Sequence, residues 1–289
     1  MTKPARGEGD TIKITVKDVL EIDYEKVLVV IKNFMRKYFE TTGADNLVIG
    51  LSGGIDSSTL LAVLAETVDR EKIIALILPD TRVTPEEDVK DAVLLAEKYG
   101  VRYHIVEIDR IVDSFTVIPG FNIDGKLDTG NLRARIRMAI MYYYANRYNG
   151  IVVGSSDRSE LLIGYFTKYG DGGADILPLG CLFKTQVRML GKRLGLPRRI
   201  TEKPSSPRLW RDHLAEEEIG LKYEEVDLIL YGLFDKKLPP NEVAEAVGVP
   251  ESAVKKVLKM HCLSRHKRRF PPIPSLPWND NPVGELEYL

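Results

Sequence analysis

The sequence has few cysteines, no excess of charge of either sign and no long hydrophobic run. Its two cysteines, Cys181 and Cys262, lie far apart and match no CxxC or metal-ligand spacing, so we expect reduced thiols. A formal net charge of −1 gives no electrostatic basis for a nucleic-acid or membrane-surface protein. The N-terminus lacks an apolar signal core, and no stretch is long enough to span a bilayer. These absences predict a soluble, cytoplasmic protein without a nucleic-acid or membrane partner.

The length and the two ends of the chain bear on its domain organisation. A chain of 289 residues can bury about three-quarters of its unfolded surface, so a stable core needs no disulfide or metal. We expect a single catalytic domain over residues 1–289. The polar segment 1–10 is predicted to be disordered, and 271–289 is predicted to form a proline-rich tail without a helix.

Continuous apolar segments alternate with amphipathic ones over the first half of the chain. Strands are predicted at 47–51, 73–78, 103–108 and 151–153, between helices at 24–39, 57–68, 85–99 and 129–148. Helices resume at 183–194, 223–231, 240–247 and 251–262, whereas 164–181 and 198–214 are expected to be irregular loops. Apolar strands separated by amphipathic helices predict an α/β fold, a doubly wound parallel sheet in a Rossmann-like three-layer arrangement. Ligand is then expected at the carboxyl ends of the strands.

The segment SGGIDSS at 52–58 follows the first predicted strand and leads directly into a helix. The glycines allow the backbone N–H groups to approach an anion, and the start of the helix adds positive potential. No Gly-Lys-Ser/Thr follows, so the segment is not a Walker loop. Asp56 would repel phosphate unless a divalent cation such as Mg²⁺ lay between them. The alternative is an ordinary turn in which Asp56 only favours the start of the helix.

Two further segments carry polar side chains near predicted strand or helix ends. In GNLRAR (130–135), Asn131 and Arg135 lie four residues apart, either on a solvated cationic face or over a carboxylate or phosphate. In GSSDRSE (154–160), which follows the strand at 151–153, Ser155 is placed to contact nucleotide and Glu160 to contact a metal. The alternative for the second segment is a plain helix cap.

The loop FTKYGDGGAD (166–175) combines glycines with charges and aromatic residues. Turn formation explains its glycines but not its length or its charges. Lys184 lies within the next helical pattern, 183–194, and is placed to reach phosphate. HKRR at 266–269 is either a solvated basic cluster or a nucleic-acid patch, and no interleaved aromatic residues support the patch.

Together these segments resemble the NAD synthetase family of pyrophosphatase-loop ATP ligases, from the first helix to Pro272. The resemblance adds PLGCLFK (178–184) and Ser206 ahead of an acidic EEEIG stretch (216–220). FTKYGDGGAD discriminates best, because other pyrophosphatase-loop ligases share only SGGIDSS. The family implies an adenine nucleotide alpha hydrolase-like fold and a homodimer. The run Tyr142–Tyr144 fits a dimer interface and a core position equally well.

The resemblance also implies roles for individual residues. It places ATP on Gly50, Leu51, Ser52, Gly53, Gly54, Ile55, Asp56, Ser57, Ser155, Lys184 and Ser206. It places Mg²⁺ on Asp56 and Glu160. It places deamido-NAD on Arg135, Lys168, Asp175, His266 and Lys267. The family often has threonine where Ser155 stands, and the choice between Ser205 and Ser206 for the ATP contact stays open.

The activity implied is ATP-dependent amidation of deamido-NAD to NAD. The nicotinate carboxylate is adenylated with loss of pyrophosphate, and ammonia then displaces AMP. Asp56, Lys184 and Asp175 are expected to be catalytic, with Asp175 binding or deprotonating the incoming ammonium. Loop 164–177 is expected to close over the site and exclude water. Neither cysteine lies in an amidase motif, so free ammonia is the expected nitrogen donor.

Three other functions compete with this hypothesis. Another pyrophosphatase-loop ligase, such as a tRNA thiolase or a GMP-synthetase-like amidotransferase, is the first. A thiolase would need cysteines near the loop, and none is there. A nucleotide sensor without turnover is the second, and pyrophosphate release would decide against it. A nucleic-acid binder based on residues 265–269 is the third.

Overall fold

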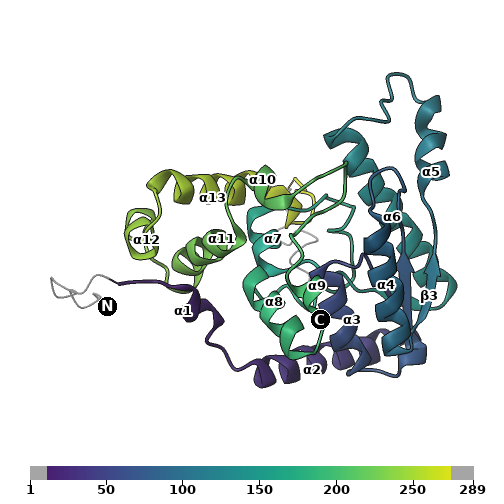
Figure 1. Ribbon diagram of the computed structural model, residues 1–289, viewed down its shortest axis with the longest axis horizontal. Helices are drawn as coiled ribbons and strands as arrows, with labels where there is room; N and C mark the ends of the chain where they lie inside the picture. The colour runs from purple at the N-terminus through teal and green to yellow at the C-terminus, as the bar shows by residue number, and fades with distance from the viewer. Residues whose placement is uncertain (1–11, 275–289) are drawn as a thin grey trace.

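The computed structural model describes residues 12–274, in which a parallel sheet and its helices are followed by a group of helices only (Figure 1). The strands are β1 (Asn46–Gly50), β2 (Ile73–Ile77), β3 (Arg102–Ile105) and β4 (Gly150–Val152). The helices up to β4 are α1 (Val16–Leu20), α2 (Tyr24–Thr42), α3 (Ile55–Ala65), α4 (Glu86–Tyr99), α5 (Asp109–Asp113) and α6 (Leu127–Arg147). Those after β4 are α7 (Arg158–Ile163), α8 (Lys184–Arg193), α9 (Arg198–Thr201), α10 (Ala215–Ile219), α11 (Tyr223–Leu230), α12 (Pro240–Val247) and α13 (Glu251–Leu263).

The four strands are all parallel and lie in the order β3-β2-β1-β4. The chain therefore moves outward from β1 to β3 and then crosses back to place β4 on the other side of β1. In open parallel sheets the crevice at such a reversal is where ligands bind. The ends of β1 and β4 carry SGGIDSS and GSSDRSE, so the topology brings these two segments together.

Helices cover both faces of the sheet because strands β1 and β2 are apolar on both sides. Leu47 and Ile49 of β1 pack in one buried cluster with α2, α3, α4 and α8. Val48 of the same strand packs in a second cluster with α5 and α6 on the opposite face. The alternation of neighbouring residues between two clusters is the result expected for a strand buried on both faces.

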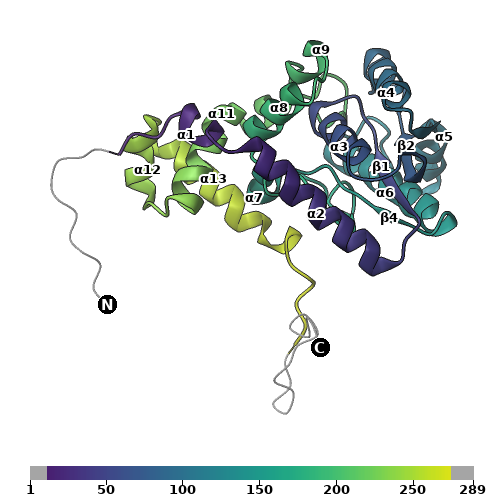
Figure 2. The same cartoon turned by 90° about the horizontal axis from the view of Figure 1, so that it is seen from below.

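A third apolar cluster lies in the group formed by α1, α10, α11, α12 and α13, and it also contains Ile163 and Phe183. Figure 2 shows this group beside the sheet, and α2 starts next to it and runs along the sheet, in whose cluster its buried residues pack. Helix α11 contributes Tyr223, Val226 and Ile229 to this cluster, and all three are fully buried. These buried apolar side chains therefore form a packed core next to the strand ends.

The predicted sheet and long helices are confirmed, with ends displaced by a few residues. Segment 164–181 contains no helix or strand, as predicted. Segment 198–214 was expected to be irregular throughout, but it begins with the short helix α9. Residues 1–10 and most of the tail 271–289 lie outside the described range, and 271–274 are neither helix nor strand. Within residues 12–274, no helix has the length and apolar character needed to cross a bilayer.

Candidate active site

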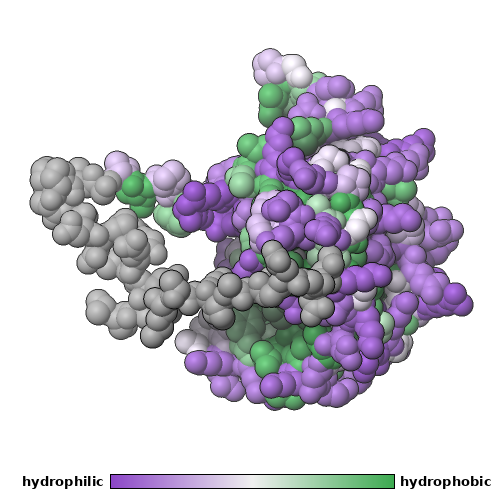
Figure 3. Space-filling view, turned by 90° about the vertical axis from the view of Figure 1, so that its left-hand side faces the viewer, coloured by the Kyte–Doolittle hydropathy of each residue, from purple (hydrophilic) through white to green (hydrophobic). Residues whose placement is uncertain are grey.

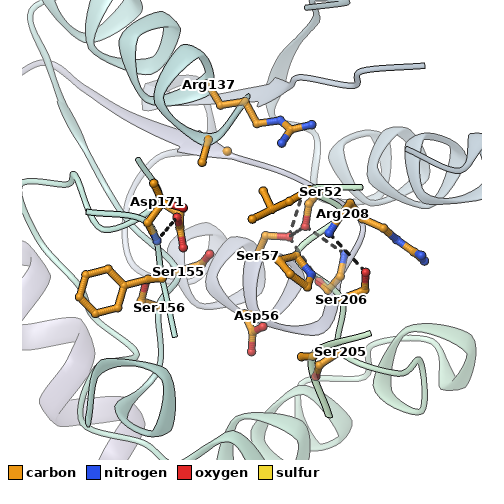
Figure 4. A pocket seen from close by; sticks show the side chains of 18 of the residues that line it. Ser52, Asp56, Ser57, Arg137, Ser155, Ser156, Asp171, Ser205, Ser206 and Arg208 are labelled. Atoms are coloured by element: carbon orange, nitrogen blue, oxygen red, sulfur yellow. Dashed lines mark hydrogen bonds between the residues drawn. The ribbon is translucent and has the colours of Figure 1, made fainter. Parts of the chain in front are cut away.

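The SGGIDSS loop joins the end of β1 to the first turn of α3 at the reversal of the sheet. The Ser57 hydroxyl accepts a hydrogen bond from the Ser52 N–H at 3.1 Å and lies 3.0 Å from the Ser52 hydroxyl. Gly53 has a φ of +73°, which a residue with a side chain rarely adopts. Figure 4 shows the Ser52 and Ser57 side chains turned toward each other, so hydrogen bonds between the loop's own serines hold its shape.

The GSSDRSE segment forms the turn from β4 into α7, next to the first loop. Asp157 is the N-cap of α7 and accepts a hydrogen bond from the Glu160 N–H at 2.9 Å. The Glu160 carboxylate accepts one in return from the Asp157 N–H at 3.2 Å. This capping box fixes the turn. The second oxygen of Glu160 takes no part in the cap and accepts a hydrogen bond from the Lys184 Nζ of α8 at 2.8 Å.

Lys184, the first residue of α8, lies between three carboxylates. Its Nζ is 2.7 Å from Asp56, 2.7 Å from Asp157 and 2.8 Å from Glu160. The side chains of Lys184 and Asp157 are 0% exposed. One oxygen from each carboxylate lies within 4.8 Å of the others. We call Asp56, Asp157, Glu160 and Lys184 the charge cluster.

The pKa values in the charge cluster are shifted by burial and by mutual interaction. Burial opposes the charge on Lys184, but the three carboxylates outweigh it and raise the pKa of Lys184 well above its usual value. Burial also raises the pKa of Glu160, and the nearby Asp157 adds to that shift. One cation facing three acids leaves the cluster short of positive charge, a situation that favours an additional cation.

An open cleft of about 360 Å³ lies beside the charge cluster. Its lining includes Ser52, Asp56 and Ser57 from the first loop, and Ser155 and Glu160 from the second. Arg137 of α6 donates a hydrogen bond to the Leu78 carbonyl at 2.9 Å and extends into the cleft across from these loops (Figure 4). The cleft thus combines the SGGIDSS loop, the carboxylates of Asp56 and Glu160, and the guanidinium of Arg137.

Gly50, Leu51, Gly54 and Ile55 of the first loop also line the cleft, whereas the predicted ATP residue Lys184 is not among the lining residues of the described chain. Ser205 and Ser206 both line the cleft, so the choice between them stays open. The Ser206 hydroxyl donates a hydrogen bond to the His213 carbonyl, whereas the Ser205 hydroxyl accepts one from Arg188 at 3.1 Å. Gly53 is absent from the lining, because its Cα faces the Asp88 backbone instead.

The residues predicted for deamido-NAD do not all lie together. Lys267 lines the cleft and donates hydrogen bonds to the Gly164 and Phe166 carbonyls at 2.8 and 2.7 Å. Within the described chain, the remaining four are not among the lining residues: Arg135, Lys168, Asp175 and His266. The Asp175 carboxylate instead accepts hydrogen bonds from the Val152 N–H at 2.7 Å and the Tyr142 hydroxyl at 3.1 Å.

Sequence reasoning did not single out several residues of the site. Asp157 follows a strand and precedes Glu160 by three residues, and this cap pattern was the available signal. Asp171 was noted from the sequence as a charge of the glycine-rich loop but was given no role, and it lines the cleft. Arg137 and Lys203 also line the cleft, but no motif marked them. Their positions depend on how α6 and the segment after α9 pack.

The fold and the site define the class of protein. A loop of the phosphate-binding type lies at the sheet reversal, has no Walker lysine and is next to acidic residues. This combination is characteristic of an α/β ATP pyrophosphatase-type ligase. The chain belongs to the NAD synthase family, whose sequence model matches residues 27–271.

Several relatives share most of their length with this chain. An NH(3)-dependent NAD(+) synthetase of Staphylothermus marinus is 57% identical over 273 residues, covering 94% of this chain and 99% of its own. One from Aeropyrum pernix is 48% identical, covering 91% and 93%. The solved structure of an NMN synthetase from Francisella tularensis is 33% identical with a TM-score of 0.79, covering 89% of this chain and all of its own.

Proposed function

We propose that the protein converts deamido-NAD to NAD, using ATP and ammonia. The observation that carries this conclusion is the full-length similarity to NH(3)-dependent NAD(+) synthetases, combined with a cleft that places the loop beside the charge cluster. The protein is a ligase that forms a C–N bond. A carboxylate oxygen of deamido-NAD attacks the α-phosphorus of ATP, and pyrophosphate leaves. Ammonia then attacks the carbonyl carbon of the acyl adenylate, AMP leaves with the C–O bonding electrons, and one proton is released.

The residues of the cleft account for the first step, in which negative charge gathers on the leaving pyrophosphate. The N–H groups of the SGGIDSS loop and the N-terminus of α3 can bind phosphate oxygens. Lys184 adds a buried positive charge that is already in place before the reaction, so little reorganisation is needed when the charge develops. The cleft holds both substrates in one orientation, which lowers the entropic barrier to their reaction.

The experiment that tests this function measures three products together. Purified protein, ATP, Mg²⁺, deamido-NAD and ammonium should yield NAD, AMP and pyrophosphate in equal amounts, and NAD should depend on ammonium. Pyrophosphate without NAD in the presence of ammonium would contradict the proposed acceptor or donor. No release of any of the three would favour a nucleotide sensor.

A second candidate substrate comes from the solved NMN synthetase, which is similar over most of this chain. The same two steps on nicotinate mononucleotide would give NMN. The chemistry at the carboxylate is identical, so the two substrates are distinguished by kcat/KM in direct competition. We expect deamido-NAD to be preferred, because the relatives with the higher identities are NAD synthetases.

We also propose that Mg²⁺ is held by Asp56 and Glu160, with Asp157 as a third carboxylate. The donor set suits a hard cation, and one buried oxygen of Asp56 has no hydrogen-bond partner within residues 12–274. When bound, Mg²⁺ would neutralise charge on the leaving pyrophosphate.

Replacing Asp56 by asparagine tests the metal assignment. The Asp56→Asn variant should lose Mg²⁺ binding and pyrophosphate release, because an amide supplies one weaker oxygen ligand in place of a carboxylate. Calorimetric titration with Mg²⁺ in the absence of substrates checks the binding directly. Wild-type Mg²⁺ affinity in the variant would contradict the assignment.

We further propose that the protein acts as a homodimer in the cytoplasm. Two observations support a dimer. Four predicted substrate residues lie outside the cleft of one chain, where a second chain could complete their site. In addition, Val29, Val30 and Phe34 of α2 are exposed, and Figure 3 shows apolar side chains gathered in a hollow on one face. Sedimentation velocity should give twice the chain mass of 32.6 kDa, and a single-chain mass would contradict the dimer.

The cytoplasmic location is supported by the two free, exposed cysteines, Cys181 and Cys262, which suit a reducing compartment. Fractionation of the source cells would check this location, and recovery of the protein outside the cytoplasmic fraction would contradict it.

A further inference from the structure

Helix α11 places two buried polar side chains next to the charge cluster, and neither is among the described residues that line the cleft. Tyr223 and Asp227 lie four residues apart, on one face of the helix, and are 0% and 1% exposed. No motif in the sequence pointed to either residue. Burying a carboxylate is unfavourable unless it is well hydrogen-bonded, so the contacts of Asp227 need an explanation.

Asp227 accepts hydrogen bonds from the two elements that carry the charge cluster. One oxygen accepts from the Ser159 hydroxyl at 2.5 Å, and the other accepts from the Thr185 N–H at 2.8 Å. Ser159 precedes Glu160 in the first turn of α7, and Thr185 follows Lys184 in the first turn of α8. The carboxylate thus joins the starts of two helices.

Ser159 completes this connection. Its hydroxyl donates to Asp227 and accepts a hydrogen bond from the Lys184 N–H at 2.9 Å. The first N–H groups of a helix lack partners within the helix. Those of Lys184 and Thr185 are therefore satisfied by Ser159 and Asp227, which fix the backbone from which the Lys184 side chain extends.

Tyr223 contacts the other end of the same lysine. The Lys184 Nζ lies 5.0 Å from the centre of the Tyr223 ring, a cation–π distance between two side chains that are both fully buried. The Tyr223 hydroxyl has no hydrogen-bond partner among residues 12–274. The contact with lysine is therefore made by the ring.

We infer that Asp227 is a positioning residue for pyrophosphate release, acting through Lys184 and Glu160, and that the Tyr223 ring supports it at the Lys184 ammonium. This inference rests on the proposed function for its effect on turnover. Asp227 touches neither the cleft nor the reacting atoms. It sets the relative position of a cation on α8 and a carboxylate on α7, whose charges together act on the leaving pyrophosphate in the proposed function.

Asp227→Asn is the decisive variant, because both contacts of Asp227 are hydrogen-bond donors. Asparagine keeps the volume but has one acceptor oxygen and no charge, so the two charge-assisted contacts cannot both be kept, and at best the Ser159 hydroxyl accepts from the asparagine NH₂ group instead of donating. We expect kcat for pyrophosphate formation to fall about 10- to 100-fold, as for other residues that orient a metal or phosphate site. The KM for deamido-NAD should be unchanged.

Ile229→Ala is the matched control. Ile229 is a fully buried residue of α11 in the third apolar cluster, so its truncation lowers stability without removing a hydrogen bond to α7 or α8. A second pair of variants distinguishes the contribution of the Tyr223 ring from that of its hydroxyl. Tyr223→Phe should keep wild-type kcat, and Tyr223→Leu should lower it.

Hydrogen exchange at the Lys184 and Thr185 amides provides a readout without turnover. Exchange at both should accelerate in Asp227→Asn more than in an Ile229→Ala protein of equal melting temperature. Equal exchange and equal kcat in these two variants would overturn the inference. Accelerated exchange in a protein whose wild type forms no NAD would leave the positioning intact and reject the proposed function instead.

Discussion

Lys184→Met should lose about 10²- to 10³-fold in the rate of pyrophosphate release, the loss typical of removing one preorganised charge from a transition-state site. Methionine keeps most of the side-chain length but leaves Asp56, Asp157 and Glu160 without the ammonium that lies 2.7–2.8 Å from each. Rapid-quench measurement of AMP and pyrophosphate checks this result.

The same substitution should also destabilise the fold. Removing one partner of a buried ion pair lowers the free energy of unfolding by about 3–5 kcal/mol, because the remaining charge is left uncompensated. Mg²⁺ should restore part of this loss in Lys184→Met if the carboxylates bind it. Lys192→Met, at an exposed lysine of the same helix, is the control and should match the wild type. Wild-type pyrophosphate release in Lys184→Met would refute the assigned role of the ammonium.

Gly53→Ala is expected to be the second most damaging substitution. A Cβ at this position would lie 2.2 Å from the Asp88 carbonyl oxygen, a backbone atom that cannot move away alone. The left-handed φ of +73° adds about 1–2 kcal/mol of strain for any residue other than glycine. The SGGIDSS loop must shift, and a displacement of about 1 Å can lower kcat/KM for ATP about 10²-fold.

Gly248→Ala distinguishes the effect of the Cβ collision from the effect of the backbone strain. Gly248 has a similar φ of +76°, but no described atom lies within 4 Å of the place its Cβ would take. This control therefore has the backbone strain without the collision. It should lose only stability, by about 1–2 kcal/mol, and keep its kcat/KM for ATP. Equal activity of the Gly53 and Gly248 variants would mean that the loop tolerates the displacement.

The parts of the site that were predicted from sequence are those encoded locally. A strand, two glycines and a helix start lie next to one another in SGGIDSS, so the loop follows from its own residues. The apolar runs of β1 and β2 are buried on both faces and were predicted for the same reason. The glycine-rich loop stood out because turns alone do not explain its charges.

The parts that were missed depend on contacts between distant segments. Asp227 is 42 positions from Thr185, and the sequence around it is that of an ordinary amphipathic helix. Asp157 is a plausible helix cap, and only its distance to Lys184 places it in the charge cluster. Helix α7 has six residues, too few for a periodic apolar pattern to identify.

The strand order has a consequence for the growing polypeptide. β1 pairs with β4, about a hundred positions later, and Lys184 and Asp227 follow still further along the chain. A nascent chain that has emerged only as far as α7 already carries three acidic groups, but neither the ammonium that neutralises them nor the helix that holds it. Domains fold as units during synthesis, and pairings between distant segments form slowly. We therefore expect the ability to cleave ATP to be acquired late in translation, and chains that end before Lys184 not to consume ATP.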